Sequence, residues 1–174
     1  MNIVLIGYRG TGKSHVARLL GEHFGRKVIS MDEEIVRTAG MPIPEIVEKF
    51  GWPKFRDMET AEARKLAGLD QLVIDCGGGI IERAENTGIL QQNGRVFWLQ
   101  ASVESIVARI QHDTQRPALV AGKTFTEEVA EVLQRRTPLY RAAAHHEINT
   151  DNRTPQQVVE LIAEFWEKAA KPLL

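Results

Sequence analysis

The chain has 174 residues, of which 43% are hydrophobic and 26% charged, so a single domain over residues 1–174 can bury a core. The formal net charge of −1 gives no electrostatic reason to expect nucleic acid or an anionic membrane as a partner. One cysteine excludes an internal disulfide, no apolar run approaches the roughly 20 residues that cross a bilayer, and no signal-peptide pattern opens the chain, so we expect a cytoplasmic protein. We also expect a monomer.

The first half of the chain alternates between predicted strands and helices. A continuous apolar run at 3–6 indicates a strand buried on both faces, and the helical spacing of Val16, Leu20 and Phe24 predicts a helix from Lys13. The next predicted elements are a strand at 27–31, helices at 33–38, 43–50 and 53–67 separated at Gly40 and Gly51, and a strand at 71–75.

The second half continues this alternation. Its predicted elements are a strand at 95–99, a helix at 103–110, a polar loop at 111–124, a helix at 125–136 that ends before Pro138, and a short strand at 147–149. Thr154 and Pro155 then predict the N-cap and the first turn of a last helix.

Strands that alternate with helices predict an α/β fold with a parallel sheet covered on both faces. Ligands of such sheets bind at the carboxyl ends of the strands. Three features directly follow predicted strands: a glycine-rich stretch after the first, Asp32 after the second, and the triple glycine 77–79 after the third. We therefore expect these features to converge on one crevice.

The glycine-rich stretch at residues 7–14, GYRGTGKS, matches the phosphate-binding pattern G-x-x-x-x-G-K-[ST] in full. Its glycines let backbone N–H groups turn toward one anion, and the helix that follows adds the partial positive charge of its amino end. Lys13 can reach the outer phosphates of a nucleoside triphosphate, and the Ser14 hydroxyl can ligate the accompanying Mg²⁺. The pattern specifies the ligand and leaves the reaction open.

Two other classes of triphosphate-binding protein fit less well. A GTPase would add a D-x-x-G and an N-K-x-D; residues 75–78 fit the first pattern formally, but no N-K-x-D occurs. A large ATPase would carry an apolar run ending in Asp-Glu far beyond the first loop, whereas residues 28–33 begin only 14 residues after Ser14. The sequence therefore favours a kinase of a small acceptor.

Several short motifs occur in a fixed order along nearly the whole chain. They are Asp32-x-Glu34, Gly51-x-x-x-Phe55-Arg56-x-x-Glu59, Gly77-Gly78-Gly79, Arg116-Pro117-x-Leu119 and Arg136-x-Pro138-Leu139-Tyr140. In this combination the chain resembles the shikimate kinase family. The resemblance implies ATP-dependent phosphorylation of the 3-hydroxyl of shikimate to shikimate 3-phosphate and ADP, a step of the chorismate pathway to aromatic amino acids. It also implies a three-layer P-loop fold like that of nucleoside monophosphate kinases, with a five-stranded parallel sheet in the order 2-3-1-4-5.

For the acceptor, the resemblance implies a site within a segment of about 32–60 and on neighbouring loops. Arg56 and Arg136 would hold the carboxylate of shikimate, a task that suits planar guanidinium groups. Glu59 would orient Arg56, and Glu34 would accept hydrogen bonds from substrate hydroxyls as a candidate base. The remaining contacts with the substrate would come from Gly77, Gly78 and Gly79.

For the nucleotide, the resemblance implies ATP with Mg²⁺. Ser14 and Asp32 would bind the metal, and Arg116 would close over the phosphates from a lid at about 111–124 and act in catalysis with Lys13, Asp32 and Glu34. Arg109 and Pro155 would sandwich the adenine. The nucleotide-binding residues would be Gly10, Thr11, Gly12, Lys13, Ser14, His15, Arg109, Arg116, Arg153 and Pro155.

The sequence leaves some assignments open. The family usually has Asp where Glu34 stands, and a carboxylate moved by ~1 Å can cost ~10²-fold in rate, so the acceptor could be another polyol acid. The alternatives are a gluconate kinase-like enzyme and a nucleotide-binding regulatory protein without turnover. Arg135 stands beside Arg136, so either could face the substrate, and Asp32 could also be a helix N-cap.

Overall fold

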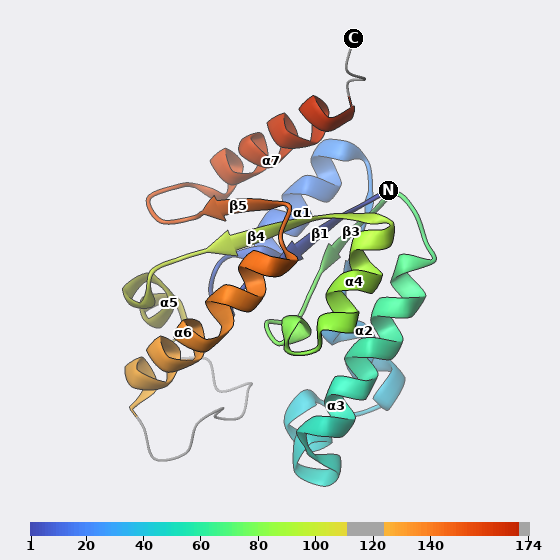
Figure 1. The fold of residues 1–174 in the computed structure, drawn as a ribbon, viewed down its shortest axis with the longest axis vertical. Helices are drawn as coiled ribbons and strands as arrows, with labels where there is room; N and C mark the ends of the chain where they lie inside the picture. Colours follow the sequence, from blue (N-terminus) through green and yellow to red (C-terminus); the bar gives the residue numbers. More distant parts are fainter. Residues whose placement is uncertain (111–123, 171–174) are drawn as a thin grey trace.

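A five-stranded parallel sheet forms the centre of the computed structural model, which describes residues 1–110 and 124–170 (Figure 1). Its strands are β1 (Asn2–Ile6), β2 (Lys27–Ser30), β3 (Leu72–Asp75), β4 (Gly94–Gln100) and β5 (His146–Asn149). They lie in the order β2-β3-β1-β4-β5, and each neighbouring pair is parallel. The predicted sheet and its strand order are confirmed.

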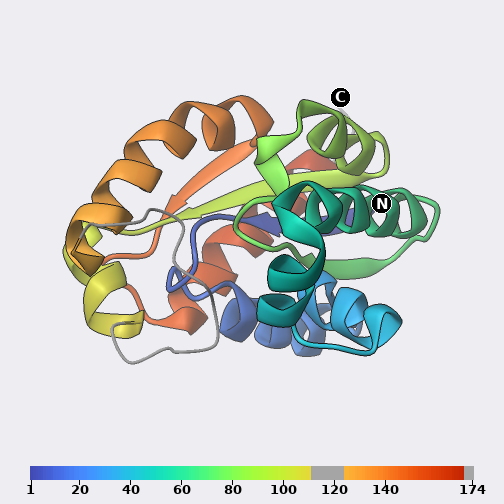
Figure 2. The same cartoon turned by 90° about the horizontal axis from the view of Figure 1, so that it is seen from below.

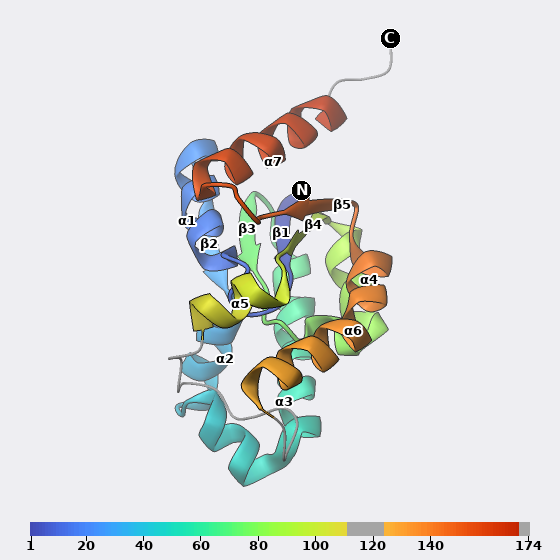
Figure 3. The same ribbon diagram turned by 90° about the vertical axis from the view of Figure 1, so that its left-hand side faces the viewer.

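Helices cover both faces of the sheet, which gives three layers (Figures 1 and 3). The helical elements are α1 (Lys13–Phe24), α2 (Met31–Ala39), α3 (Ile43–Ala67), the 3₁₀ turn η1 (Ile80–Glu82), α4 (Ala84–Gln92), α5 (Val103–Ile110), α6 (Phe125–Ala143) and α7 (Pro155–Ala170). In Figure 3, α1 and α7 lie on one face of the sheet, and α4 and α6 lie on the other. Because successive side chains of a strand point to opposite faces, Ile3 and Leu5 of β1 join the core under α1 and α7, whereas Val4 and Ile6 join the other core.

Two smaller groups of helices lie beyond the carboxyl ends of the strands. Helix α2 and the first part of α3 pack around Ile35, Ile46 and Phe55, while α5 and α6 pack around Ile106 and Val129. Figure 2 shows the loop after β1 between these two groups. The glycine-rich loop is therefore flanked by helices that can carry side chains toward a ligand.

Helix α6 continues through Pro138 to Ala143, so its predicted end before Pro138 is wrong. Proline has no N–H to donate and usually breaks a helix. Here Tyr140 and Ala143 are buried in the core under α4 and α6, and this burial holds the last turns in the helix. Helix α4 has no counterpart in the sequence prediction, because only Asn86 and Leu90 among its residues are buried and its apolar spacing is weak.

The break predicted at Gly51 is confirmed. Gly51 has φ 80° and ψ 165°, which kinks α3 between its two helical parts. At the far end of the chain, the Thr154 hydroxyl accepts the N–H of Gln157, as the predicted N-cap of α7 requires. Within residues 1–110 and 124–170, the helices are all too short or too polar to cross a membrane.

Candidate active site

The loop after β1 leads directly into α1, and together they form a cavity suited to phosphate groups. Gly12 is the N-cap of α1 and supplies no side-chain cap, so the N–H groups of the first turn remain available to an anion. This phosphate cavity is lined by Arg9, Gly10, Gly12, Lys13, Ser14, His15, Ser30, Asp32, Glu33, Asp75, Cys76, Gly77, Gly78 and Ile110. The glycine-rich loop, Asp32 and the first glycines of the triple glycine thus meet in one crevice, as predicted.

Hydrogen bonds hold the glycine-rich loop in its curled form. The Lys13 ammonium and the Thr11 hydroxyl both donate to the carbonyl oxygen of Tyr8, at 3.1 and 2.8 Å. The Ser14 hydroxyl donates to a carboxylate oxygen of Asp75 at 2.6 Å. The loop is therefore joined through Ser14 to the carboxyl end of the neighbouring strand β3.

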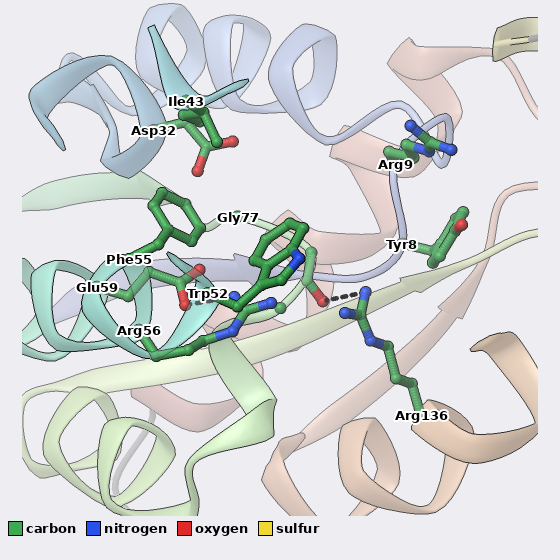
Figure 4. Close-up of a pocket in the computed structure, with 12 residues that line it drawn as sticks. Tyr8, Arg9, Asp32, Ile43, Trp52, Phe55, Arg56, Glu59, Gly77 and Arg136 are labelled. Carbon is green, nitrogen blue, oxygen red and sulfur yellow. Dashed lines mark hydrogen bonds and ion pairs between the residues drawn. The ribbon is translucent and has the colours of Figure 1, made fainter. Parts of the chain in front are cut away.

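A second cavity, called here the acceptor cavity, adjoins the first (Figure 4). It is lined by Tyr8, Arg9, Asp32, Ile43, Trp52, Phe55, Arg56, Glu59, Gly77, Gly78, Gly79 and Arg136. Figure 4 shows the guanidinium groups of Arg56, from α3, and Arg136, from α6, directed into this space. The structure thus brings together Arg56, Arg136, Glu59 and the triple glycine, which the sequence assigned to the substrate.

Arg56 is held by a buried carboxylate and an aromatic ring. It donates to Glu59, and the two side chains are only 14% and 2% exposed, so this is no surface ion pair. Burial raises the pKa of Glu59, and the charge and hydrogen bond of Arg56 oppose that shift. The guanidinium carbon also lies 5.2 Å from the centroid of the Trp52 ring. A Cβ atom at Gly79 would overlap this guanidinium, so a glycine at that position makes room for it.

Arg136 rather than Arg135 faces the acceptor cavity. Its side chain is 4% exposed, and it donates to Glu82 at 2.7 Å and to the Gly78 carbonyl oxygen at 3.4 Å. Arg135 is 56% exposed and donates to the same carboxylate from outside. Partial burial raises the pKa of Glu82, but the hydrogen bonds and charges of the two arginines outweigh it and lower that pKa to about 2. A charged Glu82 therefore orients Arg136.

The two cavities share a wall. Arg9, Asp32, Gly77 and Gly78 line both of them. Asp32 lies in the first turn of α2, whose N-cap is Ser30, so Asp32 is not itself the N-cap. A Cβ atom at Gly77 would lie 2.6 Å from a carboxylate oxygen of Asp32, so any other residue at position 77 would displace this carboxylate. Asp32 thus stands where a phosphate donor and an acceptor would meet.

Glu34 lies outside the acceptor cavity, contrary to its predicted role there. Its carboxylate accepts hydrogen bonds from Arg37 and Lys65, at 2.5 and 3.2 Å, and these bonds lower its pKa to about 2. The physical reason is helical geometry: residues two apart on an α-helix point about 200° apart. Since Asp32 faces the cavities, Glu34 faces away from them.

A third cavity lies on the other side of the glycine-rich loop. It is lined by Thr11, Gly12, His15, Val16, Arg109, Thr150, Arg153, Pro155 and Val158. This cavity brings together His15, Arg109, Arg153 and Pro155, which come from α1, α5, the loop after β5 and α7. All four belong to the residues that the sequence assigned to the nucleotide, and Arg109 and Pro155 are the two that it assigned to the adenine. Arg116 and almost all of the predicted lid lie outside the described residues.

The oxygen atoms of the phosphate cavity suit a hard divalent cation. Ser14 supplies a hydroxyl, and Asp32 and Asp75 supply carboxylates, which are donors that Mg²⁺ prefers. In the part of the chain that the structure describes, no three or more His, Cys, Asp or Glu side chains are grouped so that they could hold a metal by themselves. A Mg²⁺ ion at this place would need phosphate oxygens as further ligands, which is its usual arrangement in kinases.

The sequence prediction missed Arg9, Trp52 and Glu82. Arg9 occupies an undefined position of the phosphate-binding pattern, and it pairs with Glu128 of α6 at 3.3 Å. Glu82 lies in η1, where no pattern indicated a structured element. A signal was available for Trp52, which precedes Arg56 by four residues and therefore shares its face of the helix.

A phosphate-binding loop with the cavity of His15, Arg109, Arg153 and Pro155 on one side and an arginine-lined acceptor cavity on the other defines the class of protein: a P-loop kinase of a small anionic acceptor. The profile of the shikimate kinase family matches residues 9–167, and the chain belongs to this family. A curated shikimate kinase of Thermodesulfovibrio yellowstonii is 39% identical over 167 residues, which cover 96% of this chain and 95% of that protein.

Solved structures agree with this assignment. The shikimate kinase from Acinetobacter baumannii in complex with shikimate superposes with a TM-score of 0.91 and is 36% identical, covering 97% of this chain and 93% of that one. A gluconokinase from Sinorhizobium meliloti 1021 has a TM-score of 0.56 and 17% identity, with 98% and 97% of the two chains covered. This second likeness shows a shared fold alone.

Proposed function

We propose that this protein transfers the γ-phosphoryl group of ATP to the 3-hydroxyl of shikimate, giving shikimate 3-phosphate and ADP. Its membership of the shikimate kinase family supports both substrates. The structural observation that carries the proposal is the shared wall of the phosphate and acceptor cavities, formed by Arg9, Asp32, Gly77 and Gly78. Donor and acceptor groups bound in these cavities would touch at that wall.

The acceptor cavity has the chemistry that shikimate requires. Shikimate is a small ring with one carboxylate and three hydroxyls. Arg56 and Arg136 offer charged donors in planar arrays, which bind carboxylates well. Glu59 and Glu82 fix these two guanidinium groups, so little side-chain freedom is lost when the substrate binds. The rings of Trp52 and Phe55 supply apolar surface for the carbon skeleton.

The reaction that we propose is a direct in-line transfer. The hydroxyl oxygen forms a bond to the γ-phosphorus while the bond between that phosphorus and the ADP oxygen breaks, and the hydroxyl proton passes to a base. Asp32 is the carboxylate on the shared wall and would orient the hydroxyl and take this proton. Lys13 and the first-turn N–H groups of α1 would stabilise the charge on the phosphates.

Mg²⁺, when bound with the nucleotide, would offset the negative charge of the phosphates. Ser14 and a carboxylate at the rim of the phosphate cavity would hold it. This assignment is supported by the donor set of that cavity, which consists of hydroxyl and carboxylate oxygens.

A coupled assay of ADP release tests the proposed reaction. The purified protein is supplied with ATP and Mg²⁺ and with shikimate, gluconate or no acceptor. We expect release of ADP that depends on shikimate. Turnover on gluconate and not on shikimate would show that gluconate is the acceptor. Nucleotide binding without turnover on either would favour the regulatory alternative.

Two arginine variants on α3 test the acceptor cavity. Arg56→Ala removes a charge-assisted hydrogen bond and should raise the KM for shikimate by about 10- to 100-fold. Arg64→Ala is the matched control, because Arg64 lies on the same helix in an exposed ion pair with Glu85. Its KM should stay within about twofold of the wild type. An unchanged KM in Arg56→Ala would remove Arg56 from the site.

A further inference from the structure

We propose that Asp75, at the end of β3, is the carboxylate that anchors the nucleotide-bound Mg²⁺, and that Asp32 serves the acceptor instead. This inference rests on the proposed use of ATP. It changes the sequence-based assignment, in which Asp32 was the metal-binding carboxylate. It also gives a role to the pattern at residues 75–78, which the assignment to a kinase left without one.

The sheet places Asp75 beside the phosphate-binding loop. In the strand register, Asp75 is paired with Leu5 of β1 on one side and with Ser30 of β2 on the other. Leu5 precedes the glycine-rich loop by two residues, so the carboxyl end of β3 points at the same edge of the sheet as that loop. The Asp75 side chain lines the phosphate cavity and is 7% exposed.

The hydrogen bond between Ser14 and Asp75 prepares both groups for a cation. The Ser14 hydroxyl has one proton, and it donates that proton to Asp75 at 2.6 Å. The lone pairs of the Ser14 oxygen then remain available to a metal ion in the phosphate cavity. A carboxylate in contact with the serine ligand can also accept hydrogen bonds from waters in the shell of Mg²⁺, which keeps several of its waters when bound. In many P-loop proteins the loop Ser or Thr and an Asp share the metal in this way.

Ser30, the last residue of β2, and Asp32, which follows this strand, have other contacts. Ser30 pairs with Asp75 in the sheet, but its hydroxyl accepts the Glu33 N–H as the N-cap of α2. Asp32 lies against Gly77, next to the buried Glu59, and lines the acceptor cavity as well as the phosphate cavity. Asp75 lines only the phosphate cavity of these two. The position of each carboxylate therefore assigns Asp75 to the metal and Asp32 to the acceptor hydroxyl.

Charge gives this assignment a second, measurable consequence. Asp75 brings a negative charge next to a site for anionic phosphates, and without a cation the two repel. Replacing Asp75 by Asn should therefore weaken metal binding while leaving metal-free ADP bound as tightly as before or more tightly. A residue that only supported the loop would weaken ADP binding with and without metal.

The test compares Asp75→Asn with Asp32→Asn. Mn²⁺ replaces Mg²⁺, and electron paramagnetic resonance measures its affinity for the protein saturated with ADP, while calorimetry in EDTA measures ADP binding alone. We expect Asp75→Asn to lower the Mn²⁺ affinity by roughly 10- to 100-fold, as the loss of an outer-shell carboxylate does. Asp32→Asn should leave that affinity within about twofold and instead reduce kcat with shikimate.

Thermal unfolding without ligands controls for damage to the fold. Asp75→Ala cannot retain the hydrogen bond to Ser14 and should lose at least as much Mn²⁺ affinity as Asp75→Asn. The proposal is overturned if Asp75→Asn binds Mn²⁺ like the wild type, or if Asp32→Asn is the variant that loses it. The Mn²⁺ and calorimetric measurements use no ligand besides Mn²⁺ and ADP, so their result stands even if the acceptor is not shikimate. Failure of the shikimate assay with normal Mn²⁺ results would contradict the proposed reaction alone.

Discussion

Glu82 forms ion pairs with both adjacent arginines of α6, Arg135 and Arg136. Which arginine faces inward depends on the rotation of the helix about its axis, and Arg136 stands four residues after Val132 and four before Tyr140, both buried. This spacing places Arg136 on the buried face, but it could not be used in advance, because the sequence prediction ended the helix before Pro138 and so left Tyr140 outside it. Glu82 was not predictable, because it comes from a short 3₁₀ turn and meets α6 only in the tertiary structure.

Glu82→Gln should lower stability in a way that depends on pH. The pKa of Glu82 is about 2 in the folded protein, below its ordinary value of 4.5, so its charge stabilises the fold above about pH 4.5. That contribution is lost as the pH falls from about 4.5 to about 2. Urea unfolding between pH 3 and 7 should show a stability gap between wild type and Glu82→Gln that is widest near neutral pH and narrows below about pH 4.5.

Glu22→Gln provides the control for this measurement. Glu22 pairs with Arg18 on α1, and both side chains are more than half exposed. Such surface pairs contribute little, so this variant should match the wild type at every pH. A stability gap for Glu82→Gln that does not narrow in acid would contradict the ionic role of Glu82.

Among the elements, α3 does most to shape the acceptor cavity. Its kink at Gly51 turns the second helical part so that Trp52, Arg56 and Glu59 line one wall. Glycine is required there, because the combination of φ 80° and ψ 165° is almost closed to other residues. The break was predictable from Gly51 and from Pro53, since proline favours the first turn of a helix. The angle between the two parts of α3 was not predictable, because it depends on how α2 packs against them.

Gly51→Ala should destabilise the protein by about 1 to 3 kcal/mol, because alanine would adopt a strained backbone conformation. Gly88→Ala is the matched control. Gly88 lies within α4, and a Cβ atom there would have no neighbour within 4 Å. This second substitution should stabilise the protein by about 0.4 to 1 kcal/mol. The Tm should therefore shift in opposite directions for the two variants. An unchanged Tm in Gly51→Ala would show that a side chain causes no strain at the kink.

For the whole molecule, the alternation of strands and helices predicted a parallel sheet with both faces covered, and the structure confirms it. The strand order followed from the family resemblance and not from the pattern, because many orders satisfy the same alternation. The end of α6 and the presence of α4 could not be predicted locally. Both depend on burial against the sheet, which outweighs the effect of Pro138 in one case and compensates weak amphipathicity in the other.

Bound ligands should stabilise the whole fold, since the cavities lie between groups of helices that unfolding would separate. Shikimate or ADP at about 100 times its Kd should add about 2.7 kcal/mol of stability. In Arg136→Ala the shift of Tm by shikimate should be lost while the shift by ADP remains, because Arg136 lines only the acceptor cavity of the two. A full shift by shikimate in this variant, measured by thermal unfolding, would contradict the arginine pair as the carboxylate site.

Trp52 gives the molecule an optical label at the place where the acceptor binds. Its indole ring lies over Arg56 and lines the cavity, whereas Trp98 is buried against Tyr140 and Trp166 lies on α7 near Phe24. A carboxylate arriving beside Arg56 changes the electric field at one indole of three. The intrinsic fluorescence of this protein should therefore distinguish binding of shikimate from binding of the nucleotide, without any dye.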